Sequence, residues 1–369
     1  MGDIDARMPE QNISHEPGQE DGLLDLNEIM HRFGIDTWEN LGPDEDAPGP
    51  NLSVLVEIEG RRYVLRERPE GMLEENLAHR YDFQHYLQQA GIPLPAFHLT
   101  PQGEAAVALG EDYFELQQWS GGERFSSSGP RSLDWVEHAG TMLGRIHVAS
   151  QAYTGHMHRW PSEVHIGGMV QSWLGLARAR ADEIQPQAVS VALNDWVEQW
   201  EAVLPAAMMS IGSNRNLPEF HIHGDYYPLN LRFNAFGVTA VLGLEASHWE
   251  KRIFEVAYAL FSFGALSWQP DEALTHPLTK RGFEPERAQR FLQAYGELCP
   301  PSPGEAALLT DALLLMAPIA TINGPLEDLF YQQGLPPETL IDDVMERLHW
   351  AASLPAWLQR TRRALTDMW

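Results

Sequence analysis

One short stretch of the chain, residues 221–231, carries the side chains best suited to catalysis. It reads HIHGDYYPLNL. The carboxylate of Asp225 directly follows His223 and Gly224, and the amide of Asn230 comes five residues later. Taken singly, Asp225 could cap a turn and Asn230 could be an ordinary loop amide. The combination fixes five residue types at fixed spacing, which favours a functional loop over unrelated turn residues.

This loop resembles the catalytic loop of the aminoglycoside phosphotransferase family, which belongs to the protein-kinase-like superfamily. Members of that family carry His-Gly-Asp, two variable positions, often Pro, one further position and Asn, and every one of these positions is matched here. The resemblance implies that Asp225 accepts or orients the hydroxyl of an acceptor, and that Asn230 reaches a magnesium ion through its amide oxygen. His223 and Gly224 would shape the loop rather than react. Phosphoryl transfer needs mainly a positioned hydroxyl and cations over the phosphate oxygens.

The next apolar stretch, residues 238–245, departs from the pattern of the family. Relatives end this strand in an Asp that is the main magnesium ligand, usually followed two residues later by a second acid. Here Gly243 takes the Asp position and Glu245 matches the second acid. Residues two apart on a strand share a face and lie about 6.6 Å apart, a distance that the Glu245 side chain partly covers. We therefore expect Asn230 and Glu245 to be the metal ligands, and Gly243→Asp to raise magnesium-dependent ATP binding.

The resemblance also indicates residues that would bind the nucleotide. Arg66, in the run YVLR, stands where the superfamily has a lysine for the α- and β-phosphates, and no lysine precedes Lys251. Arginine is a permanent, planar cation and can hold phosphate with a different geometry. Arg80 falls about where many relatives have the Glu that pairs with this lysine. The remaining candidates for an acidic partner of Arg66 are Glu74, Glu75 and Asp82. The segment that would touch the adenine is Gln117, Gln118 and Trp119.

Hydrophobic periodicity places these motifs on secondary-structure elements. Strand-like runs cover residues 52–58, 62–65, 105–109 and 113–119. Helical patterns precede and follow the first pair of strands, at residues 23–35 and 72–90. From about residue 130 the patterns are mostly helical, with an extended region at 219–245. The expected helices there cover 133–147, 167–183, 187–204, 251–267, 285–298, 304–322 and 336–352.

The resemblance and the order of elements together predict an α+β, two-lobe protein-kinase-like fold. We expect residues 1–21 to be a disordered tail, because they are polar and acidic. Residues 22–119 would form a small N-lobe with the nucleotide-binding sheet and one helix. Residues 120–369 would form a large, mainly helical C-lobe that contains the catalytic loop 221–231. The nucleotide would lie between the two lobes.

Composition narrows the classes of partner. The 369 residues include 44% hydrophobic residues, enough for a sizeable core, and 52 acids against 25 bases give a net charge of −27. Such a chain should repel nucleic acid and anionic lipid, so we expect neither, whereas a cationic acceptor would suit it. Cys299 is the only cysteine, which excludes an internal disulfide and favours a reducing, cytoplasmic setting. No apolar run is long enough to cross a bilayer, and the N-terminus lacks the pattern of a signal peptide.

Two functional hypotheses remain open from the sequence. The first is an ATP- and magnesium-dependent enzyme that phosphorylates a hydroxyl of an aminoglycoside-like, amino-alcohol or sugar-like small molecule. The second is a catalytically inactive pseudokinase that serves as a nucleotide-binding or protein-interaction module, and Gly243 is its main support. The magnesium dependence of nucleotide binding would separate the two.

Overall fold

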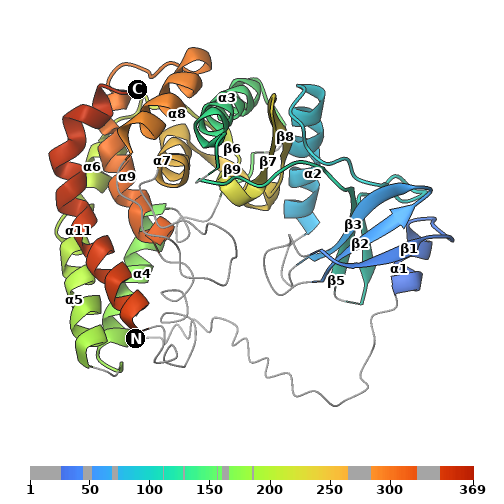
Figure 1. The fold of residues 1–369 in the computed structure, drawn as a ribbon, viewed down its shortest axis with the longest axis horizontal. Coiled ribbons are helices and arrows are strands. Elements are labelled where there is room, and N and C mark those ends of the chain that lie inside the picture. The colour runs from blue at the N-terminus through green and yellow to red at the C-terminus, as the bar shows by residue number, and fades with distance from the viewer. Residues whose placement is uncertain are drawn as a thin grey trace, which may run out of the picture.

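The structure is a computed structural model that describes residues 26–44, 52–68, 74–110, 112–127, 129–155, 157–159, 166–184, 187–264, 284–321 and 341–369. The predicted tail over residues 1–21 lies outside these ranges. Figure 1 shows a small lobe built on a sheet beside a large lobe built mainly of helices. The predicted α+β class is therefore confirmed.

The small lobe is an antiparallel sheet with strand order β1-β2-β3-β5-β4. Its strands are β1 (Glu39–Pro43), β2 (Ser53–Ile58), β3 (Arg61–Arg68), β4 (Ala106–Leu109) and β5 (Asp112–Gln118), and α1 (Leu26–Arg32) precedes them. Side chains alternate between the two faces of a strand. One face therefore carries the apolar cluster of the small lobe, which includes Ile29, Phe33, Val54, Val56, Leu65, Phe114 and Leu116. The other face presents Arg66 and Arg68 of β3 beside Glu115 and Gln117 of β5.

Helix α2 (Glu74–Gln89) lies between the sheet and the large lobe (Figure 1). Its side chains Phe83 and Leu87 are fully buried, and they belong to the apolar core of the large lobe rather than to that of the sheet. Arg80 and Tyr81 of the same helix contact Glu115 of β5. The contact between α2 and the sheet is therefore largely polar, and hydrophobic packing joins α2 to the large lobe.

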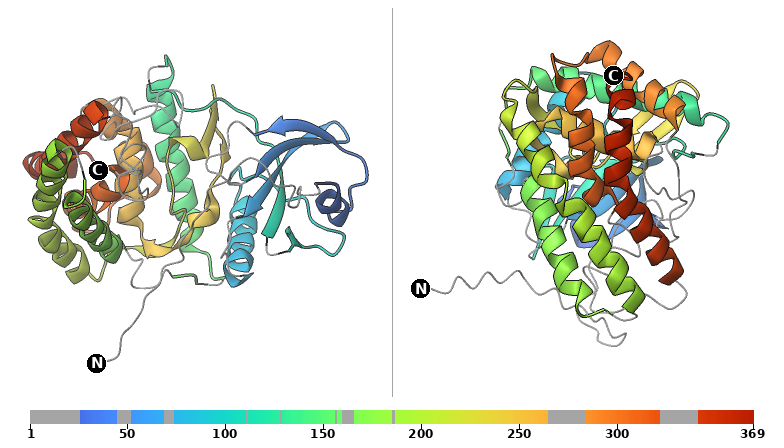
Figure 2. Two further views of the ribbon diagram at one scale, coloured as in Figure 1. Left: turned by 90° about the horizontal axis from the view of Figure 1, so that it is seen from below. Right: turned by 90° about the vertical axis from the view of Figure 1, so that its left-hand side faces the viewer.

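The large lobe is mainly helical, and its two short antiparallel strand pairs lie on the side nearest α2 (Figure 2). The described helices are α3 (Ser132–Gln151), α4 (Ile166–Ala181), α5 (Gln187–Glu201), α6 (Leu204–Ser213), α7 (Arg252–Phe263), α8 (Pro285–Leu298), α9 (Glu305–Thr321) and α11 (Ile341–Thr366). One strand pair joins β6 (Glu219–Ile222) to β9 (His248–Lys251), and the other joins β7 (Leu231–Asn234) to β8 (Gly237–Val241). Two single-turn helices, η1 (Pro228–Asn230) and η2 (Leu244–Ala246), lie beside them. No helix of the described ranges is long and apolar enough to span a membrane.

Three elements differ from the sequence prediction. Helix α6 was not predicted, because Pro205 interrupts the apolar pattern, but in the first turn of a helix the missing N–H removes no bond. Helix α11 continues past the expected end at residue 352 and through Pro355, because Leu358 and Leu365 are buried in the core. Strand β1 has few good strand formers, yet it pairs with β2 as an edge strand. In each case tertiary contacts outweigh local propensity.

Candidate active site

The loop 221–231 is shaped by a buried carboxylate from α7. Glu255 accepts the backbone N–H groups of His223 and Gly224 at 3.1 and 2.6 Å, and it lies 2.8 Å from Nε2 of His147. Burial opposes the ionisation of Glu255, but the hydrogen bonds outweigh it and keep its pKa below the ordinary value. Gly224 has a φ of +86°, and a Cβ there would collide with the backbone of Ala246. These contacts explain why the loop needs glycine at this position.

Asp225 is held by two side chains on either side of its carboxylate. The hydroxyl of Tyr258 donates to Oδ1 at 3.0 Å, and Nδ2 of Asn230 donates to Oδ2 at 2.8 Å. The same Asn230 nitrogen also donates to the backbone carbonyl of Asp225. Burial raises the pKa of the Asp225 carboxyl, while His223 and the two hydrogen bonds oppose the rise. A fixed carboxylate with a raised pKa suits a residue that takes up a proton.

The residues predicted to bind the nucleotide meet in one place. A small hollow of about 30 Å³, open to solvent, lies between the sheet and the large lobe, and residues from both sides line it. Its lining includes all four expected residues, which are Arg66, Gln117, Gln118 and Trp119, together with Asp44, Arg232 and Leu242. Asp44 is the acidic neighbour of Arg66, with 3.6 Å between Arg66 Nη2 and Asp44 Oδ2. Asp82, one of the expected partners, instead accepts a hydrogen bond from Tyr153.

Gly243 lies beside Asn230 and leaves no room for a side chain. Its φ of +76° and ψ of 36° are left-handed, a conformation that residues with a Cβ adopt only with strain. A Cβ built on Gly243 would stand 2.5 to 2.8 Å from the amide atoms of Asn230. The place where relatives carry a carboxylate is therefore filled by the amide that orients Asp225.

This geometry reverses the expectation for Gly243→Asp. We now expect the variant to unfold at a lower temperature and to bind nucleotide more weakly with magnesium, because the new Cβ displaces Asn230. Gly60→Asp is the matched control, since Gly60 has a φ of +75° and nothing within 4 Å of its Cβ position. Thermal unfolding and calorimetry of both variants separate crowding from backbone strain, which alone is about 1–2 kcal/mol. A gain in magnesium-dependent affinity for Gly243→Asp would contradict this prediction.

Glu245 belongs to a buried ion cluster that joins the two lobes. Its carboxylate pairs with Nη1 of Arg68 and lies 3.9 Å from Nη1 of Arg80. Glu115 pairs with both of these arginines and also accepts hydrogen bonds from Tyr81 at 2.6 Å and Gln117 at 3.1 Å. Burial opposes the ionisation of Glu245, but the two guanidinium groups outweigh it and hold its pKa well below the ordinary value. We refer to Arg68, Arg80, Glu115 and Glu245 as the lobe-bridging cluster.

These residues fit a magnesium ion poorly. Magnesium needs one or two carboxylates in a nearly octahedral shell of oxygens. Gly243 supplies no carboxylate, and Glu245 is engaged by two arginines. Within the described residues there is no group of three His, Cys, Asp or Glu side chains that could hold a metal. The metal roles of Asn230 and Glu245 therefore stay predictions that this arrangement does not favour.

Four histidines, His79, His158, His221 and His248, gather at the start of the loop 221–231. His221 lies 4.6 Å from His79 between ring centroids, and its Nε2 accepts the backbone N–H of His158 at 3.2 Å. His248 also lies close enough to affect its charge. Burial, reinforced by these neighbours, lowers the pKa of His221 to about 3. The fold therefore favours the neutral form of His221.

Acid should therefore destabilise the protein through His221. Because its pKa is about 3 in the fold and about 6.5 when unfolded, the unfolded chain binds more protons between these pH values. The contribution of His221 to the free energy of unfolding is complete above about pH 6.5. Below that pH it falls by up to about 1.36 kcal/mol per pH unit. Urea unfolding at pH 5, 6 and 7 measures this slope, which His221→Gln should flatten. Exposed His31→Gln should leave the slope unchanged, and an equal slope in both variants would contradict the assignment.

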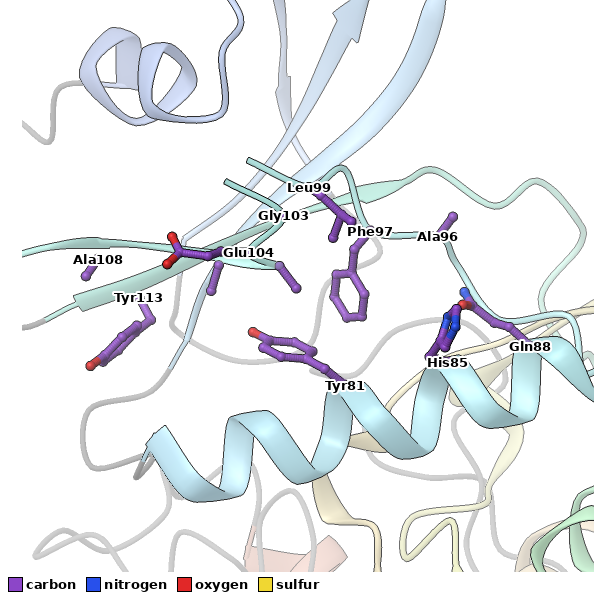
Figure 3. A pocket seen from close by; sticks show the side chains of 12 residues that line it. Tyr81, His85, Gln88, Ala96, Phe97, Leu99, Gly103, Glu104, Ala108 and Tyr113 are labelled. Atoms are coloured by element: carbon purple, nitrogen blue, oxygen red, sulfur yellow. The ribbon is translucent and has the colours of Figure 1, made fainter. Parts of the chain in front are cut away.

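A second hollow lies on the small lobe, between α2 and the strand pair β4–β5 (Figure 3). Figure 3 shows Tyr81, His85 and Gln88 of the helix facing Phe97 and Tyr113 from the strand side. No residue of the catalytic loop lines this hollow. It is therefore separate from the candidate active site, although the hydroxyl of Tyr81 touches the lobe-bridging cluster at Glu115.

Sequence reasoning missed several residues that the fold brings to the site. Arg68 could have been found, since it lies two residues after Arg66 on the same face of β3. Glu115 also left a signal, a charge between Phe114 and Leu116, and it is fully buried. Tyr258 and Arg232 left no comparable signal, because their roles depend on how α7 and β7 pack beside the loop.

Comparison with known proteins identifies the family. The family model for the phosphotransferase enzyme family, APH, matches residues 50–309, so the chain belongs to that family. The fold is that of small-molecule kinases and aminoglycoside phosphotransferases. Among curated protein sequences no significant match is found.

Three solved structures illustrate this similarity of fold. A microcompartment-associated aminopropanol kinase has a TM-score of 0.62 at 14% identity, with 92% of this chain and 97% of that chain covered. An amicoumacin kinase in complex with AMP-PNP and Ca²⁺ has a TM-score of 0.59 at 16% identity, with 93% of each chain covered. An aminoglycoside phosphotransferase from Alicyclobacillus acidocaldarius has a TM-score of 0.56 at 13% identity, with 92% and 96% covered. The predicted kinase-like fold is confirmed.

Proposed function

We propose that this chain transfers the terminal phosphate of ATP to a hydroxyl group of a small, amine-bearing molecule. The observation that carries the proposal is the carboxylate of Asp225, which Asn230 and Tyr258 fix. The Asn230 carbonyl accepts the N–H of Leu242, which lines the same hollow as Arg66 and the segment 117–119. This arrangement supports a role for Asp225 as the base and for Arg66 as a cation that binds phosphate. Family membership supports the same reaction class.

In the proposed reaction Asp225 acts as the proton acceptor. The hydroxyl oxygen of the acceptor forms a bond to the γ-phosphorus, and its proton passes to the carboxylate of Asp225. The bond between the γ-phosphorus and the bridging oxygen breaks, and ADP leaves with that electron pair. Positioning of the reactants and stabilisation of the phosphate charge supply most of the rate enhancement in such reactions.

The net charge of the chain favours a cationic acceptor. The chain carries a net charge of −27, which attracts cations to its clefts. One protein of similar fold is an aminopropanol kinase, and aminopropanol carries both an amine and a hydroxyl. An amino alcohol would place its hydroxyl at Asp225 and its cation in an acidic field.

A panel of amino alcohols tests this proposal by the release of ADP. Each active compound is compared with its N-acetyl derivative, which lacks the positive charge, and with its O-methyl derivative, which lacks the attacking hydroxyl. We expect turnover only with the parent compounds. Activity that survives N-acetylation would overturn the cationic class, and ADP release with the O-methyl compounds would overturn hydroxyl phosphorylation.

A second candidate function is a nucleotide-binding module without phosphotransferase activity. The observation that favours it is the absence of a side chain at Gly243, where the family's metal-binding carboxylate is expected. ATP binding together with no turnover on the whole panel would support this candidate.

A further inference from the structure

The lobe-bridging cluster contains more cationic charge than the resemblance leads one to expect. Arg80 stands about where relatives have a Glu, and Arg68 adds a second guanidinium close to it. Their side chains are only 4% and 6% exposed. Burial and the nearby charge of Arg68 lower the pKa of Arg80 to about 10, so Arg80 is a cation at neutral pH.

The two carboxylates of the cluster differ in how firmly they are placed. Glu115 is fully buried and contacts both arginines, Tyr81 and Gln117. The Glu245 side chain is 29% exposed and comes from the large lobe. Glu245 is therefore the carboxylate that can leave, and its departure would free an anion site on Arg68 and Arg80.

The arginines also have hydrogen-bonding capacity to spare. Nε of Arg68 and both Nε and Nη1 of Arg80 are buried without a hydrogen-bond partner in the structure. Buried polar groups are almost always satisfied, so such donors indicate a missing acceptor. A phosphate group has more acceptor oxygens than a carboxylate and suits a planar guanidinium fork.

The cluster adjoins the nucleotide hollow. Gln117 lines the hollow and donates to Glu115, and Arg66, which also lines it, shares a face of β3 with Arg68. A nucleotide bound in the hollow would therefore lie next to the lobe-bridging cluster.

We propose that Arg68 and Arg80 form a phosphate clamp that takes the place of the metal ion, and that Glu245 occupies this clamp until a nucleotide phosphate displaces it. This inference rests on the proposed use of a nucleotide. In the role predicted from the sequence, Glu245 would be a metal ligand and would promote binding. In this chain Glu245 competes with the phosphate for the same two arginines.

The two roles of Glu245 predict opposite results for Glu245→Gln. If Glu245 competes, the variant binds ATP more tightly without magnesium, by about three- to tenfold. A metal ligand would behave differently: its loss would weaken binding with magnesium and leave magnesium-free binding unchanged. Calorimetric titration with ATP, and with inorganic tripolyphosphate as the probe of the clamp alone, is made in EDTA and in excess magnesium.

Glu219→Gln is the matched control, because it removes the same charge from an ion pair with Arg159 outside the cleft. Arg68→Gln should weaken tripolyphosphate binding at least tenfold, and if that variant fails to fold, Glu245→Gln still decides. Unchanged or weaker magnesium-free binding by Glu245→Gln, or no binding by either protein, overturns the clamp. If Glu245→Gln binds more tightly but no acceptor is turned over, the clamp stands and the proposed phosphotransferase is refuted. If the wild-type protein shows magnesium-dependent turnover that Glu245→Gln loses, the clamp is refuted and the phosphotransferase stands.

Discussion

Replacing Asp225 with Asn is expected to lower kcat by a factor of about 100 to 10,000, the usual contribution of a general base. The amide keeps the shape of the carboxylate and can still accept a hydrogen bond from Tyr258 through its oxygen. It cannot take up the hydroxyl proton, so the loss should fall on kcat and leave ATP affinity within about twofold. At 1.36 kcal/mol for each factor of ten, the barrier rises by about 3–5 kcal/mol.

Steady-state kinetics and ATP calorimetry measure these two quantities separately. Asp195→Asn makes the same chemical change on the exposed face of α5 and should leave both unchanged. Because burial raises the pKa of Asp225, wild-type kcat should also fall as the pH drops towards that pKa and the base becomes protonated. Retention of more than a tenth of the wild-type kcat by Asp225→Asn would show that another group accepts the proton.

The second large effect is expected at Glu115, the fully buried carboxylate of the lobe-bridging cluster. Glu115→Gln leaves the charges of Arg68 and Arg80 buried with Glu245 as their remaining carboxylate partner in the cluster. Breaking a buried ion pair by removing one partner typically destabilises a protein by about 3–5 kcal/mol. We therefore expect the midpoint of thermal unfolding to fall on the order of ten degrees.

Two further variants make the result interpretable. Glu39→Gln, on the exposed strand β1, removes one negative charge from the same sheet and should change stability by less than about 0.5 kcal/mol. Replacing Arg68, Arg80 and Glu115 together by Met or Leu should restore much of the stability, since apolar residues can replace a buried ion cluster. A Glu115→Gln variant as stable as wild type would mean that the arginines are already neutralised elsewhere.

The candidate catalytic loop was predictable because its residues are contiguous. Loop 221–231 fixes Asp225, Asn230 and the conformation at Gly224 within eleven residues, so one pattern indicates them together. The segment Gln117, Gln118 and Trp119, predicted from the resemblance to the family, begins at the end of β5 and lines the same hollow as Arg66. Local order along the chain was sufficient in both cases.

The lobe-bridging cluster was not predictable from such patterns. Its four members come from β3, α2, β5 and η2, and Arg68 and Glu245 are 177 residues apart in the sequence. A charged residue is normally predicted to be exposed. Glu115 and Arg80, each considered alone, would therefore be placed wrongly at the surface. Only the packing of α2 onto the large lobe brings the four charges together. The same kind of long-range contact accounts for β1, α6 and the end of α11.

The attachment of α2 to the large lobe has a consequence for motion. If the cleft opens along the boundary between the sheet and α2, Arg68 and Glu115 travel with the sheet, while Arg80 and Glu245 stay behind. Each departing half then contains one cation and one anion, so neither lobe is left with uncompensated charge. The sheet and α2 could then separate and rejoin at this boundary with little electrostatic penalty. Such an opening would let nucleotide enter and product leave without unfolding either lobe.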